Sequence, residues 1–86
     1  MRARYLPAAD RVDRDGEAVL LVGREVVRLS ELATTLLDSC PDWTPESELV
    51  GVLLATFGPT PEGVDPVAVT EAALLTLRDQ GLVELD

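Results

Sequence analysis

The first third of the chain alternates short apolar runs with two-residue turn signals. Residues 17–22 form a nearly continuous apolar run, and residues 25–29 alternate between the two faces of a strand. Asp15-Gly16 is typical of a type I′ hairpin turn, and Gly23-Arg24 fits a type II′ turn. A short polar segment over residues 11–14 comes before the first turn. The pattern therefore predicts a three-stranded antiparallel meander.

Helical spacing of apolar residues replaces this pattern after residue 30. Ser30, Thr44 and Asp65 are suited to cap helix N-termini, and a proline follows two of them at the first helical position. Gly81 is suited to end the last helix in the left-handed conformation, followed by an extended tail over residues 82–85. We predict three helices, over residues 31–39, 45–57 and 66–80.

The order of these elements predicts an α+β fold, with a three-stranded antiparallel β-meander followed by a three-helix bundle, winged-helix-like in topology. The 86 residues are expected to form one domain, and a hydrophobic content of 47% is enough for a small core. Residues 1–9 are expected to form a flexible N-terminal arm, because Pro7 cannot donate to a strand ladder and Ala8-Ala9 show no periodicity.

Charge is distributed unevenly along the chain. Residues 1–30 carry six arginines and five acidic residues, whereas residues 31–86 carry one arginine and eleven acidic residues. A helical half this acidic is expected to repel a phosphate backbone, so we expect no nucleic-acid partner. No apolar run approaches the roughly 18 residues of a membrane helix, and we expect no membrane association. A single cysteine and the lack of a signal-peptide pattern favour the cytoplasm.

The chain offers little that could carry catalysis. It contains no histidine, so no Ser-His or Cys-His nucleophile pair can form, and one cysteine is not a zinc cluster. No glycine-rich phosphate-binding motif occurs. We therefore expect a protein that is not an enzyme and needs no cofactor or metal. Cys40 is expected to be a buried thiol with a raised pKa, and Trp43 to fill a gap between helices or to anchor a partner.

The third strand is the most promising feature for binding. As the last strand of the meander it has one edge without a partner, to which an extended peptide could add as a further strand. Arg24, Glu25 and Arg28 could instead be charges that protect this edge from aggregation.

The third helix has two apolar stripes. Val67, Thr70, Leu74 and Leu77 are expected to face the core, and a shallower stripe could face either the core or a peptide groove. Arg78 at the helix end could orient a charged peptide. The candidate peptide-binding residues on the strand and the helix are Arg24, Glu25, Val26, Val27, Arg28, Leu29, Ala68, Ala72, Leu75, Arg78 and Asp79.

Two segments resemble a known family. Residues 15–37 contain a hairpin that leads into a strand–helix junction of the form V-x-L-S-x-x-A-x-x-L-L, and residues 77–83 contain the closing pattern L-x-x-x-G-L-V. In this order the two patterns resemble the PqqD-like family, the recognition elements of ribosomal peptide natural-product pathways. The resemblance covers residues 10–85.

The resemblance implies a non-catalytic protein that binds the leader of a precursor peptide by strand addition. The acidic, lysine-free chain is most similar to the stand-alone proteins of lasso-peptide pathways, which work with a leader peptidase and a cyclase. A chaperone for a radical-SAM peptide-modifying enzyme is the alternative within the family. Outside it, the alternatives are a protein-interaction domain that binds a folded partner and a winged-helix DNA-binding protein.

Overall fold

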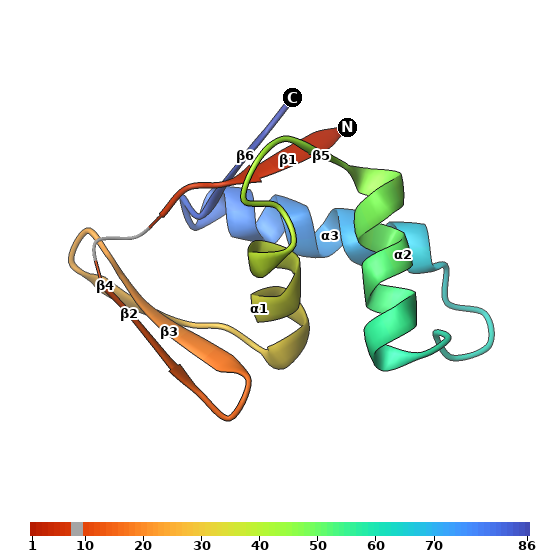
Figure 1. Cartoon of the computed structure of the whole chain (residues 1–86), viewed down its shortest axis with the longest axis horizontal. Helices are drawn as coiled ribbons and strands as arrows, with labels where there is room; N and C mark the ends of the chain where they lie inside the picture. Colours follow the sequence, from red (N-terminus) through yellow and green to blue (C-terminus); the bar gives the residue numbers. More distant parts are fainter. Residues whose placement is uncertain (8–9) are drawn as a thin grey trace.

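The structure, a computed structural model, describes residues 1–7 and 10–86 (Figure 1). Three helices and two small antiparallel sheets make an α+β fold, as the sequence predicted, although the likeness to a winged helix is loose. The elements, in chain order, are β1 (Arg2–Tyr5), β2 (Asp10–Arg14), β3 (Glu17–Val22), β4 (Glu25–Arg28), α1 (Glu31–Asp38), β5 (Thr44–Pro45), α2 (Glu46–Phe57), α3 (Pro66–Asp79) and β6 (Val83–Leu85).

The predicted meander is confirmed as a sheet with the strand order β2-β3-β4. Asp15 and Gly16 both have positive φ, 53° and 80°, as a type I′ turn requires. Gly23 has a φ of 61°, as the first central residue of a type II′ turn requires. Both turns are two residues long, and this fixes the register of each hairpin.

Two of the three predicted helix caps are confirmed. The Ser30 hydroxyl accepts from the N–H of Ala33, and the Asp65 carboxylate accepts from the N–H of Val67. The prediction for Thr44 was wrong. Thr44 and Pro45 pair with β1 as β5, and α2 begins at Glu46, whose N–H donates to the carbonyl of Met1. A neighbouring strand thus supplies the contact expected from a capping side chain.

The expected N-terminal arm is also a misprediction for residues 2–5. These residues form β1, the central strand of a second sheet with the order β5-β1-β6 (Figure 1). Ala3 is completely buried, and Arg2 and Arg4 form ion pairs with Asp86 and Glu84. The predicted C-terminal tail is the third strand of this sheet. Ala8 and Ala9, also assigned to the arm, lie outside the described residues.

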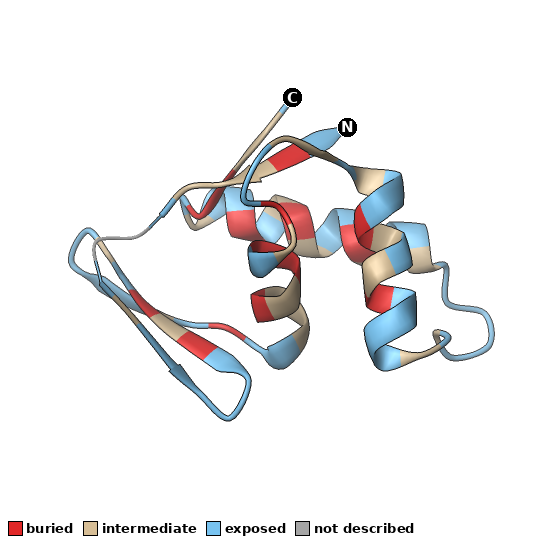
Figure 2. Cartoon of the chain, in the orientation of Figure 1, coloured by how far each residue is buried: buried red, intermediate tan, exposed pale blue. Residues whose placement is uncertain are grey.

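The core lies where the helices meet each other and the inner face of the meander (Figure 2). Each main element contributes buried side chains, among them Leu20 from β3, Leu36 from α1, Leu49 from α2 and Leu74 from α3. The predicted core stripe of α3 is confirmed at Thr70, Leu74 and Leu77. It is wrong at Val67, which is 46% exposed because the first turn of α3 extends past the core.

No helix in the described part of the chain is both long enough and apolar enough to cross a membrane.

Candidate functional site

The meander has an open edge at β4. This strand pairs with β3 on one side, and no described strand pairs with it on the other. Its side chains are mostly exposed, and only Val27 turns partly into the core. An unpaired strand edge is a row of hydrogen-bonding groups that another extended chain can satisfy.

The ladder between β3 and β4 defines which backbone groups are free. The N–H of Leu29 donates to the carbonyl of Ala18 at 2.8 Å. In an antiparallel pair, residues that exchange hydrogen bonds alternate with residues that do not. Glu25 and Val27 therefore point their N–H and C=O groups at β3, like Leu29. Val26 and Arg28 point theirs at the open edge.

A hollow lies at the end of this edge. It has a volume of about 270 Å³, and its walls come from the end of β4, the start of α1 and the C-terminal half of α3. Its lining is mainly apolar, with Arg28 as its charged group. The lining residues are Arg28, Leu29, Ser30, Leu32, Ala33, Ala73, Thr76, Leu77 and Gln80. Of the predicted strand residues, Arg28 and Leu29 line this hollow, whereas Arg24, Glu25, Val26 and Val27 do not.

The helical wall of this hollow differs from the predicted one. Ala73, Thr76 and Gln80 line it, whereas Ala68 and Ala72 are exposed and do not. Leu75, Arg78 and Asp79 are also absent from the lining. The predicted stripe lies on the adjacent face of α3, about 100° round the helix. No signal in the sequence favoured the observed face, because Thr76 and Gln80 make it less apolar than its neighbour.

Among the seven arginines, four have carboxylate partners. Arg2, Arg4 and Arg11 form ion pairs that link different parts of the fold or stay within β2, and Arg78 pairs with its neighbour Asp79 at 3.2 Å. The remaining three, Arg14, Arg24 and Arg28, have no ion-pair partner within residues 1–7 and 10–86, and all three lie on the meander or its turns. They share the meander with carboxylates that likewise have no ion-pair partner in the described part of the chain, namely Asp10, Asp15, Glu17 and Glu25.

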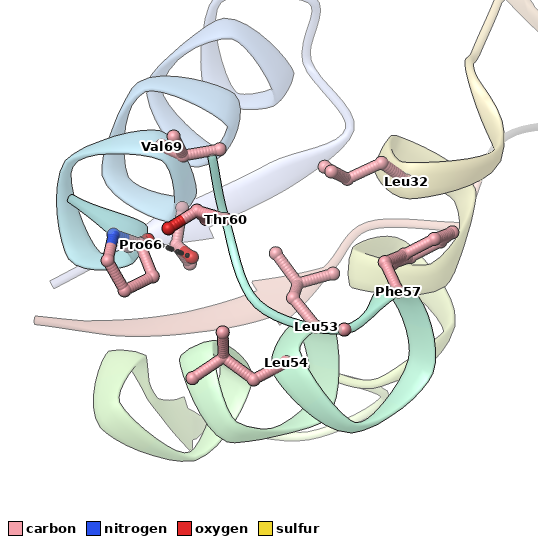
Figure 3. A pocket seen from close by; sticks show the side chains of 9 residues that line it. Leu32, Leu53, Leu54, Phe57, Thr60, Pro66 and Val69 are labelled. Atoms are coloured by element: carbon pink, nitrogen blue, oxygen red, sulfur yellow. Dashed lines mark hydrogen bonds between the residues drawn. The ribbon is translucent and has the colours of Figure 1, made fainter. Parts of the chain in front are cut away.

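A second, smaller hollow of about 50 Å³ lies between the three helices. Figure 3 shows Leu32 of α1, Leu53 and Leu54 of α2 and Val69 of α3 around it. Leu32 lines both hollows, and Val69 precedes Ala73 by one helical turn on the same face of α3. The two hollows are therefore neighbours along one face of α3.

The outer face of the meander is also apolar. Val12 is 66% exposed and Val26 is 72% exposed, with Leu21 and Val19 between them on β3. Cross-strand pairs place Leu21 beside Val26 and Val19 beside Val12. The face is a second surface, separate from the hollow, that a partner could cover.

The two residues with other candidate roles lie away from the open edge. Cys40 is buried, as expected, and burial raises the pKa of its thiol. Trp43 does not fill a gap between helices. The guanidinium groups of Arg2 and Arg4 lie 5.2 and 5.0 Å from its ring centroid, so it stacks beside β1. Within the described residues, no three potential metal ligands lie together.

Comparison with known proteins found no matching family model, no matching curated protein and no matching solved structure.

Proposed function

We propose that this protein binds an extended peptide as a fourth strand on β4, and that the peptide is the leader of a ribosomally made precursor. The open edge of β4, beside an apolar hollow, is the observation that carries the proposal. Main-chain hydrogen bonds to Val26 and Arg28 would supply affinity, and the hollow would supply side-chain selection. The proposal includes no catalytic step.

Two arginines beside the open edge favour an acidic peptide. Arg24 and Arg28 have no carboxylate partner among the described residues, and Arg28 is the charged residue that lines the hollow. Charges at the rim of a binding surface mainly raise the association rate. Arg78 contributes less than the sequence suggested, because Asp79 already pairs with it.

Charge also disfavours pairing of β4 with a second copy of itself. Two antiparallel strands related by a two-fold axis must place side chains of the same face opposite each other. On the outer face of β4 these are Val26 and Arg28, with Arg24 next in line, so self-pairing would bring arginines of the two copies close together. A peptide without these arginines is the better occupant.

The role of such a protein is to raise the local concentration of the precursor at the enzymes that process it. Binding the leader makes the attack on the core peptide effectively intramolecular. In a lasso-type pathway these enzymes are a leader peptidase and a cyclase, and a radical-SAM enzyme is the alternative partner. We propose the cytoplasm as the place where this happens.

The proposal is tested by calorimetric titration with the leader region of the precursor peptide encoded beside this gene. The Val26→Pro variant removes an N–H that points at the open edge, where proline is tolerated. We expect at least about tenfold weaker binding, since the hydrogen bond is lost and the ring obstructs the edge. Equal affinity of this variant and the wild type would contradict strand addition at β4.

A matched control lies on the opposite edge of the same sheet. Arg14 and Glu17 close the first two-residue turn, so the alternation along β2 points the N–H of Asp13 at the outer edge of that strand. Asp13→Pro therefore removes an outward N–H at the other edge, as Val26→Pro does at β4, and in addition removes the carboxylate that pairs with Arg11. We expect this variant to bind the leader as the wild type does.

A second candidate function is docking of a folded protein on the outer face of the meander, favoured by the exposure of Val12 and Val26. Val12→Asp would weaken such docking without touching the open edge of β4. The two functions are compatible, because a leader-binding protein also has to contact the enzyme that it serves.

A further inference from the structure

The meander projects to one side of the helical part of the fold (Figure 1), and the centre of its outer face is apolar. This centre is formed by Val12, Val19, Leu21 and Val26, which come from three adjacent strands. Val26 and Val12 are the most exposed large apolar side chains of the described residues. Two depressions in the face, of about 150 and 280 Å³, share Val12 and Val19 as walls. The face therefore has relief into which apolar side chains of a partner can pack.

Charges of both signs surround this apolar centre. The register of the sheet places Asp10 of β2 and Arg28 of β4 on the outer face, on opposite edge strands. Neither has an ion-pair partner in the described part of the chain. Arg14 and Glu17 lie opposite each other on the same face, beside the first turn. A complementary partner therefore needs a positive group opposite β2, a negative group opposite β4 and an apolar centre between them.

A second copy of the chain has this arrangement. Two sheets that pack face to face keep their strand directions within about 30° of each other. A two-fold axis along β3 then places β2 of each copy over β4 of the other. Asp10 lies over Val26 of the second copy, and Arg28 is the next outward residue of that strand, about 7 Å further along it. An arginine side chain can span this distance, and the symmetry repeats the contact.

The distribution of charge along the chain favours the same surface. Two copies of a chain with a net charge of −9 repel each other. Residues 10–28 carry four arginines and five acidic residues, a net charge of −1, so the rest of the chain carries −8. The meander is therefore the part at which two copies meet with the least repulsion.

We propose that the outer faces of two meanders pack together in a weak two-fold dimer, with reciprocal ion pairs between Asp10 and Arg28. The strands are only four to six residues long, so the face measures about 14 by 17 Å. Its buried area falls below the roughly 1,200 Å² of stable complexes, and we expect a Kd on the order of 100 µM.

Dimerisation through this face does not depend on the proposed binding of a peptide to β4. The dimer covers the outer face and leaves the edge of β4 open, whereas pairing of two β4 edges would close it. A second copy would also be the folded partner of the outer face. Because Arg28 belongs to both surfaces, the dimer is tested without peptide.

Sedimentation equilibrium of the full chain, from about 10 µM to about 1 mM, tests the association. We expect the average mass to rise from that of one chain towards that of two. Val12→Asp places a charge in the apolar centre and should weaken the association at least about tenfold. Val64→Asp is the matched control, because Val64 is also an exposed valine but lies between α2 and α3. This control should associate as the wild type does.

A charge exchange tests the two-fold arrangement itself. Arg28→Asp and Asp10→Arg each bring like charges together in their own dimer, and each should associate at least about fivefold more weakly than the wild type. An equimolar mixture of the two variants restores both ion pairs in a mixed dimer. We expect this mixture to associate with nearly the wild-type affinity.

Three results would overturn the proposed dimer. A protein that keeps the mass of one chain at about 1 mM has no such dimer, and its outer face is then left for a different protein. A dimer that Val12→Asp does not weaken uses another surface. A mixture of the charge variants that associates no better than either variant alone excludes the reciprocal pairs. None of these results would affect peptide binding at β4, which is measured separately.

Discussion

The two sheets of this protein differ in how far apart along the chain their strands lie. In β5-β1-β6, Ala3 pairs with both Thr44 and Leu85, so one strand joins the start, the middle and the end of the chain. In β2-β3-β4, neighbouring strands are joined by two-residue turns. The β5-β1-β6 sheet therefore joins distant parts of the chain, whereas the meander is built from strands that are neighbours in the sequence.

The two sheets also differ in how many of their arginines form ion pairs. Beside β1, ion pairs join Arg2 to Asp86 and Arg4 to Glu84, and both arginines stack on Trp43. On the meander, Arg14, Arg24 and Arg28 have no ion-pair partner in the described part of the chain. Both arginines of β1 are therefore paired, whereas on the meander Arg11 pairs with Asp13 and Asp38 and the other three arginines have no ion-pair partner among the described residues.

The comparison suggests a division of roles. β6 follows directly from α3 through Gly81, and Leu82 and Val83 are buried. The β5-β1-β6 sheet therefore fixes the end of α3, which is one wall of the hollow. The meander supplies the other wall and the open edge. We infer that the first sheet positions the site and the second binds the peptide.

The largest expected difference between the sheets comes from introducing one carboxylate into each. Ala3→Asp places a charge at a completely buried position of β1, and we expect a loss of about 3–5 kcal/mol in the free energy of unfolding. Val12→Asp places the same group on the exposed face of the meander, where we expect a change within about 0.5 kcal/mol. Urea unfolding measures both. Equal losses of unfolding free energy in the two variants would contradict the conclusion that β1 is buried in the fold and the outer face of the meander is not.

Proline substitutions divide β4 itself into two sets of positions. Val27→Pro removes an N–H that points at β3 and leaves the carbonyl of Leu20 without its donor, so we expect a loss of about 1–3 kcal/mol. Val26→Pro removes an N–H at the open edge and should change the free energy of unfolding much less. A larger loss in Val26→Pro would show that the alternation along β4 is the reverse of the one inferred here.

Trp43→Ala tests whether the cluster beside β1 serves stability alone. Two cation–π contacts at a partly exposed site contribute about 1–2 kcal/mol together, and we expect a loss of that size in urea unfolding. The affinity for peptide should stay that of the wild type, because Trp43 does not line the hollow. A loss of binding in a folded Trp43→Ala protein would place part of the site on the other sheet.

The smallest expected effect concerns the ion pair that joins the ends of the chain. The hydrogen bond from Arg2 lowers the pKa of Asp86 below its usual range. The ionised Asp86 carboxylate therefore stabilises the folded protein above the pKa of about 3.9 that it has in the unfolded chain. This stabilisation is lost as the pH falls through the lower pKa of the folded state. Asp86→Asn should lower the urea midpoint at pH 7, and the difference from the wild type should narrow at acidic pH. A constant difference would contradict this linkage.

The sequence predicted well what depends on neighbouring residues. Turn residues with positive φ, the caps at Ser30 and Asp65 and the left-handed Gly81 were all identified, because each requires a particular residue type at one position. β1 and β5 could not be identified in the same way. Their strands are two to four residues long, and their pairing depends on residues about 40 and 80 positions away.

The candidate site was predicted only in part, because only some of its features depend on neighbouring residues. The open edge follows from the order of the strands, which local turns determine. The face of α3 that meets the hollow depends on the rotation of the helix in the fold, and this rotation is fixed by packing against α2 and β6. Apolarity favoured Ala68, Ala72 and Leu75, whereas packing turned Ala73, Thr76 and Gln80 toward β4.

Hydrogen exchange of single amides in β4, measured by NMR with and without saturating leader peptide, tests the central claim most directly. In the free protein the Val27 amide should exchange slowly, and those of Val26 and Arg28 should exchange fast, because their N–H groups face the open edge. Bound peptide should slow the exchange of Val26 and Arg28 to rates near that of Val27. Unchanged fast exchange at both residues in a saturated complex would contradict strand addition to β4.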